Sequence, residues 1–276
     1  MKKTFVLLLA VVLVFGLFGC QSSEKKEEDT GDKTIVVSAT LDPHSKILEY
    51  AKPILAEKGY TLEIKVIDDY YVHNKALDDG EVDANYFQHV PFFNDEVAAN
   101  GYDIVIVANI HVEPFGFYSK TVSSVDEIKD GAVIVISNSV SDHGRILAIL
   151  EEAGLVTLTE GVTALTATTA DIVDNPKNLT FKEVKPELLS IAYEQNEGDL
   201  VAINGNYAIQ AGLNPTVDAV ILEKGGADNP YVNVVAVKNG NENNEKIQAL
   251  IDVLKSDEIK QFILDTYSDG SVIPAE

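Results

Sequence analysis

Arg145 is the only arginine among the 21 cationic side chains of this 276-residue chain. A guanidinium group carries a planar set of donors that meets a carboxylate in two parallel hydrogen bonds, which lysine cannot reproduce. Arg145 closes the polar segment Ser141-Asp142-His143-Gly144-Arg145 at the start of a predicted helix, where backbone amides also favour an anion. The residue therefore predicts a carboxylate site, although a surface position or a structural ion pair would also explain a single arginine.

Aromatic and histidine side chains gather at three places in the predicted fold. Asp69-Tyr70-Tyr71 follows a strand, Asn85-Tyr86-Phe87-Gln88-His89 follows a short apolar stretch, and Ile110-His111-Val112-Glu113-Pro114 ends another strand. In open α/β sheets, ligands bind beyond the carboxyl ends of strands, and these residues would line an apolar pocket with polar edges. Together with Arg145 they predict a site for a small zwitterion, whose apolar tail would lie among Tyr70, Phe87 and His89.

The elements that position these residues are short β-branched runs alternating with helical patterns. Strands are predicted at 34–40, 62–67, 104–107, 133–137, 200–203 and 232–237, and helices at 43–58, 143–152 and 242–254. This alternation predicts an α/β fold with largely parallel sheet. Two arrangements stay open, either one doubly wound sheet or two α/β lobes that share a cleft, with the chain crossing between them near 114–116 and 229–230.

The N-terminal residues predict export and anchoring. Lys2 and Lys3 precede an apolar run that is too short to span a membrane and fits a signal peptide at 1–19. The run ends at Leu17-Phe18-Gly19-Cys20, which resembles the lipobox of bacterial lipoproteins, so Cys20 is predicted to be acylated. Residues 20–33 would then form the lipidated cysteine and a disordered tether. We expect a protein anchored by lipid to the extracytoplasmic face of the cell membrane.

The charge of the chain excludes some partners. Removal of the leader takes away Lys2 and Lys3, which leaves 19 cationic against 44 acidic residues and a formal charge of −25. Such a charge argues against nucleic acid and against anionic lipid headgroups as partners. Because Cys20 is the only cysteine, no intrachain disulfide can form, and the folded state must be stabilised by packing.

Other kinds of site were weighed against a zwitterion pocket. A metal site is one alternative, because the chain has histidines at 44, 73, 89, 111 and 143 and Asp42 or Glu113 could complete the ligand set. None of the histidine spacings is that of a ligand pair. The chain has no nucleophile elbow, Walker A loop, dinucleotide-binding glycine motif or zinc-protease motif. We expect no catalytic residue and no cofactor. The alternatives are a metal-binding lipoprotein, a secreted enzyme with His89 or His111 as general base, or a purely structural lipoprotein.

Five groups of residues resemble the methionine-binding lipoproteins of the NlpA/MetQ type. They lie at 83–89, 111–114 with 118–120, 175–179, 203–208 and 230–233, in order along the whole predicted globule. The chain departs from that pattern in two places. His143 stands where a second glycine is usual, beside the predicted carboxylate site, and residues 186–190 lack the usual proline-arginine pair.

The resemblance implies an α/β, two-lobed periplasmic-binding-protein-like fold of type II with the ligand in the cleft between the lobes. Lobe 1 would comprise 34–113 and 230–276, and lobe 2 would comprise 114–229. The implied function is that of an extracytoplasmic solute-binding lipoprotein and not of an enzyme. It would capture L-methionine, D-methionine or a methionine-containing dipeptide and deliver it to the permease and ATPase of an ABC importer; the runner-up is a metal-binding lipoprotein of such an importer. We expect a monomer.

The resemblance also assigns ligand contacts. The residues that it implies are Tyr70, Phe87, His89, His111, Arg145, Asn204 and Asn233. The first three would surround the thioether, with His111 nearby. Arg145 would hold the carboxylate, and the two asparagines would hold the polar end of the amino acid.

Overall fold

The computed structural model describes residues 33–224, 226 and 229–275, so the predicted signal peptide, Cys20 and residues 21–32 of the tether lie outside the described residues. The strands are β1 (Thr34–Ala39), β2 (Thr61–Val66), β3 (Ala84–His89), β4 (Ile104–Val112), β5 (Gly116–Tyr118), β6 (Val133–Ser137), β7 (Thr157–Leu158), β8 (Ile172–Asp174), β9 (Thr180–Val184), β10 (Leu200–Ile203), β11 (Ile221–Leu222), β12 (Val232–Lys238) and β13 (Ile273–Pro274). The helices are α1 (Lys46–Glu57), α2 (Tyr70–Asp78), α3 (Val90–Asn100), α4 (Val140–Glu152), α5 (Leu189–Glu194), α6 (Gly205–Gln210), α7 (Pro215–Asp218), α8 (Glu245–Leu254) and α9 (Asp257–Thr266). Short helical turns lie at Leu41–Ser45, Val125–Glu127, Thr169–Asp171 and Pro186–Leu188.

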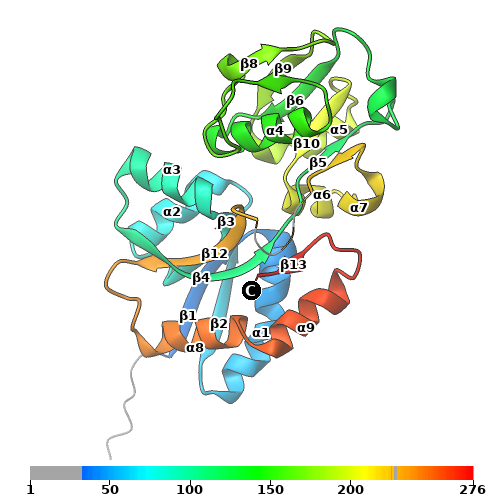
Figure 1. Ribbon diagram of the computed structural model, residues 1–276. Helices are drawn as coiled ribbons and strands as arrows, with labels where there is room; N and C mark the ends of the chain where they lie inside the picture. Colours follow the sequence, from blue (N-terminus) through cyan, green and yellow to red (C-terminus); the bar gives the residue numbers. More distant parts are fainter. Residues whose placement is uncertain (1–32, 225, 227–228, 276) are drawn as a thin grey trace, which may run out of the picture. The chain divides into compact units, whose positions relative to one another are not determined.

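The strands form two main sheets rather than one doubly wound sheet (Figure 1). The first has the order β13-β4-β12-β3-β1-β2 and the second has the order β11-β5-β10-β6-β9, with β7 and β8 as a separate pair. The chain leaves the first sheet after β4 and returns to it at β12. Of the two arrangements that the sequence left open, the fold is therefore the two-lobed one.

The sheets are mixed, whereas the sequence predicted largely parallel pairing. β1 runs parallel to β2 and β3, and β6 runs parallel to β9 and β10. In contrast, β12 pairs antiparallel with both β3 and β4, and β5 pairs antiparallel with β10 and β11. The antiparallel pairs involve the strands at the two crossings, because a strand that enters a sheet from the other sheet arrives at the opposite end.

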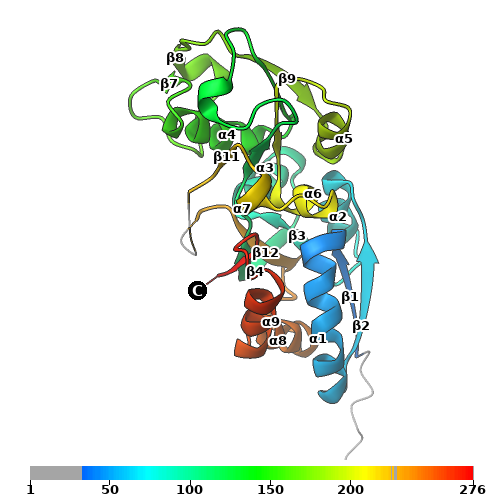
Figure 2. The same ribbon diagram turned by 90° about the vertical axis from the view of Figure 1, so that its right-hand side faces the viewer.

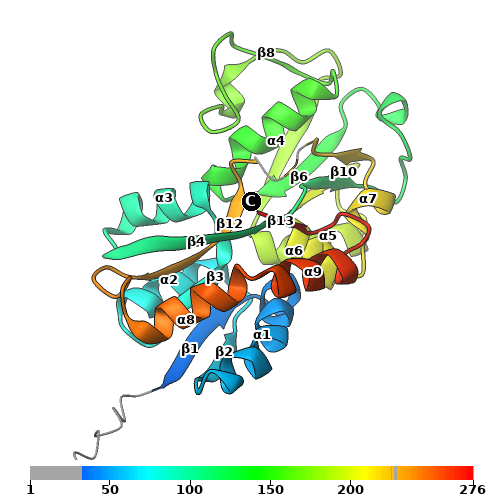
Figure 3. The same ribbon diagram turned by 60° about the horizontal axis from the view of Figure 1, so that its bottom comes forward.

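Both sheets are covered by helices on both faces, which explains their continuous apolar strands. In β6, Ile134 and Ile136 pack into one core while Val135 between them packs into another. The first sheet packs α1, α8 and α9 on one face and α2 and α3 on the other, as Figures 2 and 3 show. Among the described residues, no helix is long and apolar enough to cross a membrane.

β3 is the strand that sequence patterns placed least well. Its residues Asn85 and Gln88 are polar, yet both are buried. Asn85 Nδ2 donates to Asn74 Oδ1 at 2.8 Å, and Gln88 Nε2 donates to the same oxygen at 2.7 Å. Because these amides satisfy one another, a polar-looking segment forms a buried strand. Tyr86 to His89 therefore lie within a strand rather than after one.

Candidate ligand-binding site

A cavity lies between residues of the two sheets. Its wall comes from α2, β3, α3, α4 and β12 and from the segments after β4 and β10. The lining residues are Tyr70, Phe87, Gln88, His89, Phe92, Glu113, Asp142, Arg145, Asn204, Gly205, Asn206 and Asn233.

One end of the cavity is aromatic. The Phe87 ring lies 5.9 Å from the rings of both Tyr70 and Phe92, measured between centroids. Phe87 is held in place from behind by His73, whose ring stacks on it at 3.9 Å. Burial lowers the pKa of His73 to about 4, so the stacked imidazole is neutral near pH 7. The result is a rigid apolar wall for a hydrophobic or sulfur-containing side chain.

The cavity wall also carries two amide groups whose hydrogen-bonding capacity is only partly used. Asn204 Nδ2 donates to Asp142 Oδ2 at 3.2 Å, while its Oδ1 is buried without a partner in the described structure. Asn206 Oδ1 accepts from the Tyr70 hydroxyl at 2.5 Å, while its Nδ2 is buried and also lacks a partner there. A buried polar atom without a partner is costly. The pair thus offers a ligand one acceptor and one donor.

Asn233 is oriented by a buried histidine. His44 Nε2 lies 3.0 Å from Asn233 Oδ1, and because an amide oxygen only accepts, Nε2 is the protonated ring nitrogen. His44 Nδ1 then accepts from the Thr40 hydroxyl at 2.7 Å. This leaves the Nδ2 amine of Asn233 as the end of the amide that His44 does not use.

Two carboxylates also line the cavity. His89 Nδ1 accepts from the backbone N–H of Phe92 at 3.1 Å, so its Nε2 carries the proton and donates to Asp142 Oδ1 at 3.1 Å. Burial alone would raise the pKa of Asp142, but the hydrogen bonds from His89 and Asn204 and the charge of Arg145 outweigh it, and the pKa lies below its usual value. Burial raises the pKa of Glu113. The close approach of Glu113 requires glycine at 205, because a Cβ there would lie 2.6 Å from Glu113 Cβ.

The guanidinium of Arg145 is already paired within the chain. Its Nε donates to Glu223 Oε1 at 2.8 Å and its Nη2 to Glu223 Oε2 at 2.6 Å. We expected the Nε and Nη2 donors of Arg145 to bind a ligand carboxylate, but Glu223 occupies them. The sequence had left a structural ion pair open as an alternative explanation for the single arginine, and Arg145 forms such a pair with Glu223. Arg145 still lines the cavity, and its Nη1 makes none of the hydrogen bonds found for this side chain in the described residues.

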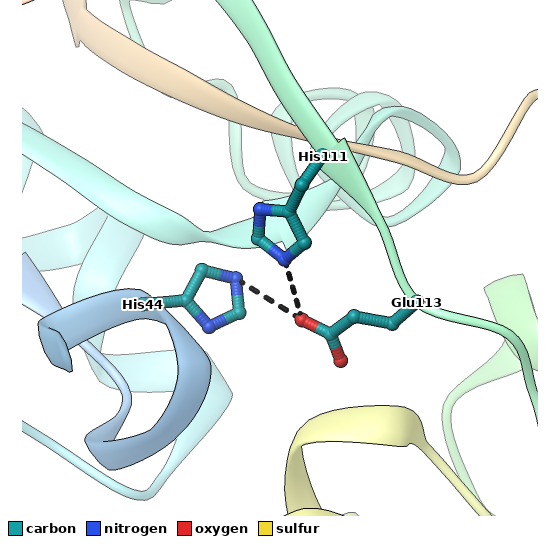
Figure 4. A group of neighbouring side chains, drawn as sticks. All are labelled: His44, His111 and Glu113. Atoms are coloured by element: carbon teal, nitrogen blue, oxygen red, sulfur yellow. Dashed lines mark hydrogen bonds and ion pairs between the residues drawn. The ribbon is translucent and has the colours of Figure 1, made fainter. Parts of the chain in front are cut away.

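His111 lies beside the cavity rather than in its wall. It is fully buried, and its Nε2 bonds to Glu113 Oε1 at 2.8 Å while its Nδ1 bonds to the Tyr86 hydroxyl. With His44 it forms the group shown in Figure 4, whose ligand-type atoms lie within 4.8 Å of one another. A metal site would need such a group of ligands from distant parts of the chain. However, all four ring nitrogens of His44 and His111 already bond to protein partners. We therefore interpret the two histidines as hydrogen-bonding partners that hold Glu113 and Asn233 in place.

The cavity brings together six of the seven ligand residues expected from the sequence, with His111 behind them. Sequence reasoning missed Asp142, Asn206, Gln88 and Phe92, and it considered Glu113 only as a metal ligand. Asn206 lies within the group 203–208 and Asp142 lies within the segment 141–145, both of which the sequence analysis described. The sequence therefore pointed to these segments but not to these two side chains as cavity residues.

Neither departure from the family pattern reaches the cavity. His143 Nε2 donates to the Ser137 carbonyl at 2.8 Å, and the side chain is absent from the lining. In the segment 186–190, Ser190 Oγ donates to the Tyr207 carbonyl at 3.0 Å, and this segment too is absent from the lining. The lining of the cavity is therefore built without either departure.

The fold and the cavity define a two-lobed α/β binding protein whose ligand site lies between two sheets. Residues 35–276 match the model of the NlpA lipoprotein family, and the chain belongs to this family. It is 50% identical over 275 residues to the methionine-binding lipoprotein MetQ of Bacillus subtilis strain 168, covering 99% of each chain.

Two solved structures share the fold. One is an ABC-transporter periplasmic substrate-binding protein from Coxiella burnetii, with a TM-score of 0.81 and 36% identity over 87% of this chain and all of that one. The other is a nutrient-binding protein from Burkholderia cenocepacia bound to methionine, with a TM-score of 0.81 and 31% identity over 88% of this chain and all of that one.

Proposed function

We propose that this protein binds methionine in the cavity between its two sheets and delivers it to an ABC importer. The observation that carries the proposal is the combination of an aromatic wall with two buried, partly used amides. The apolar side chain of a zwitterionic amino acid would pack against the aromatic wall, and its charged groups would bond to the two amides. The methionine-binding relative from Bacillus subtilis and the methionine-bound Burkholderia structure support the same ligand.

The polar groups divide into an ammonium side and a carboxylate side by their chemistry. Asn204 Oδ1, Glu113 and Asp142 are acceptors and suit the ammonium group. Nδ2 of Asn206, Nδ2 of Asn233 and the guanidinium of Arg145 are donors and suit the carboxylate. The thioether would lie among Tyr70, Phe87 and Phe92, where each sulfur contact with a ring stabilises by about 0.3–1.5 kcal/mol.

The proposed mechanism is closure of two lobes, 34–113 with 230–276 and 114–229, over the ligand. No chemical turnover is involved. Acylation of Cys20 would hold the protein at the membrane surface, where a permease and its ATPase would take up the ligand from a monomeric binding protein.

Native mass spectrometry on the soluble protein starting after Cys20 tests this function. The protein is measured as purified, after unfolding and refolding, and after addition of L-methionine, D-methionine or a methionine dipeptide, each with and without chelator. We expect an adduct of methionine mass that is lost on refolding, returns with methionine and is indifferent to chelator. Failure to bind any of these ligands would overturn the proposal, and an adduct of metal mass would replace it with a metal-binding function.

A further inference from the structure

Arg145 lies where both chain segments that connect the two sheets pass one another. The first connection runs from β4 to β5 and contains Glu113 and Phe115. The second leaves β11 at Glu223 and enters β12 after Tyr231. Arg145 itself belongs to neither connection, because it lies on α4 against the second sheet.

The Arg145 side chain contacts both connections at once. Its Nη2 donates to the Glu113 carbonyl at 2.8 Å as well as to Glu223. Its guanidinium carbon lies 4.3 Å from the centre of the Tyr231 ring and 5.2 Å from that of Phe115. One buried cation therefore joins the first connection, the second connection and α4.

Glu223 completes this junction. Besides pairing with Arg145, its Oε2 accepts from the Phe115 backbone N–H at 3.2 Å, so the carboxylate of the second connection also bonds directly to the first. Both partners are nearly buried, with side-chain exposures of 4% for Arg145 and 10% for Glu223. Two parallel bonds to one carboxylate fix the plane of the guanidinium, and a buried pair of this kind is strongly destabilised by loss of one partner.

We propose that Glu223 is a positioning residue of the ligand site. Glu223 holds Nε and Nη2 of Arg145 against both connections, so that Arg145 meets the ligand through Nη1. Ligand binding in the cavity is thereby coupled to the two connections about which the lobes move. This rests on the proposed binding of methionine. The expected consequence is that loss of the Glu223 charge accelerates ligand release.

The test is a double-mutant cycle on the affinity and dissociation rate of L-methionine, measured by calorimetry and stopped-flow fluorescence. The variants are Glu223→Gln, Arg145→Gln and the double variant, with Glu223→Asp as the conservative change. Glu197→Gln is the matched control, since Glu197 is a partly exposed acid that pairs with Lys182 on β9 and lines no part of the site.

We expect Glu223→Gln to raise the dissociation rate at least tenfold, Glu223→Asp to recover part of the loss, and the control to behave as the unchanged protein. In the Arg145→Gln background, Glu223→Gln should have less than a twofold further effect. If Glu223→Gln does not fold, Glu223→Asp and the double variant, in which neither charge is left unpaired, decide the question. An unchanged rate in the Glu223 variants, or an equal loss in both backgrounds, would overturn the positioning role. If the unchanged protein fails to bind methionine, the proposed function falls first and this inference with it.

Discussion

His44 Nε2 donates a 3.0 Å hydrogen bond to Oδ1 of Asn233, although 189 residues separate the two in the chain. The bond crosses from the turn after β1 to β12, the strand by which the chain returns to the first sheet. It determines which end of the Asn233 amide is available to a ligand, so a residue that does not line the cavity controls the chemistry of one that does.

Substitution His44→Phe should weaken methionine binding about tenfold. The change keeps a ring but removes the donor, so Asn233 Oδ1 loses its partner and the amide is free to turn; an unsatisfied buried group costs about 1–3 kcal/mol. Isothermal calorimetry measures the affinity, and His143→Phe is the control because His143 lies outside the cavity lining. Equal affinities for the His44 variant and the unchanged protein would contradict the orienting role.

Substitution Asn206→Asp should abolish binding while the protein stays folded. It replaces the unpartnered Nδ2 donor by an oxygen, which would repel a ligand carboxylate at the same place. We expect at least a hundredfold loss of affinity, together with a lower melting temperature because a buried charge is costly, but a cooperative melt that shows the variant is folded. Asn243→Asp introduces the same charge at an exposed turn and should bind normally. If the Asn206 variant retains its affinity, the carboxylate does not lie at this amide.

Substitution Phe87→Leu should reduce selectivity for the thioether. Methionine and norleucine have similar length, so their difference in affinity reports the contact between sulfur and aromatic rings, about 0.3–1.5 kcal/mol per ring. We expect the ratio of the two dissociation constants to fall toward one in this variant. Phe262→Leu, at a ring stacked on Tyr50 away from the cavity, should leave the ratio unchanged. If the ratio of the two dissociation constants is unchanged in Phe87→Leu, residues other than Phe87 are responsible for the selectivity.

Folding stability should fall as the pH is lowered from 7 to 5. Burial lowers the pKa of His44 and of His111 to about 3 and that of His73 to about 4, so the unfolded chain binds protons near pH 6.5 that the folded chain does not. Each such histidine costs up to about 1.4 kcal/mol per pH unit within this window. The raised pKa of Glu113 acts in the opposite direction and offsets part of this loss.

Urea unfolding at several pH values measures that slope. His73→Gln removes one buried imidazole that lies outside the group around Glu113, and the slope should become shallower by the share of one histidine. A slope that is the same in this variant would show that His73 does not carry the dependence.

Much of the architecture was readable from local patterns. The strands predicted at 133–137 and 200–203 have the observed bounds, because their apolar runs are buried on both faces. β3 was not readable as a strand, since the mutual hydrogen bonds of Asn74, Asn85 and Gln88 exist only once distant segments meet. The direction of β12 was likewise hidden, because pairing direction depends on where the chain returns and not on the residues of the strand.

For the site, the sequence alone picked out six of the residues that line the cavity, among them the single arginine and the two asparagines of motifs that resemble a known family. Tertiary structure decided how their hydrogen bonds are shared. Glu223, 78 residues from Arg145, occupies the edge of the guanidinium that local sequence assigned to a ligand. Within the part of the chain that the structure describes, the packing also leaves Asn204 Oδ1 and Asn206 Nδ2 without protein partners. The physical reason is that residue type sets how many hydrogen bonds a group can make, while only the packing of distant segments sets which of them the protein itself uses.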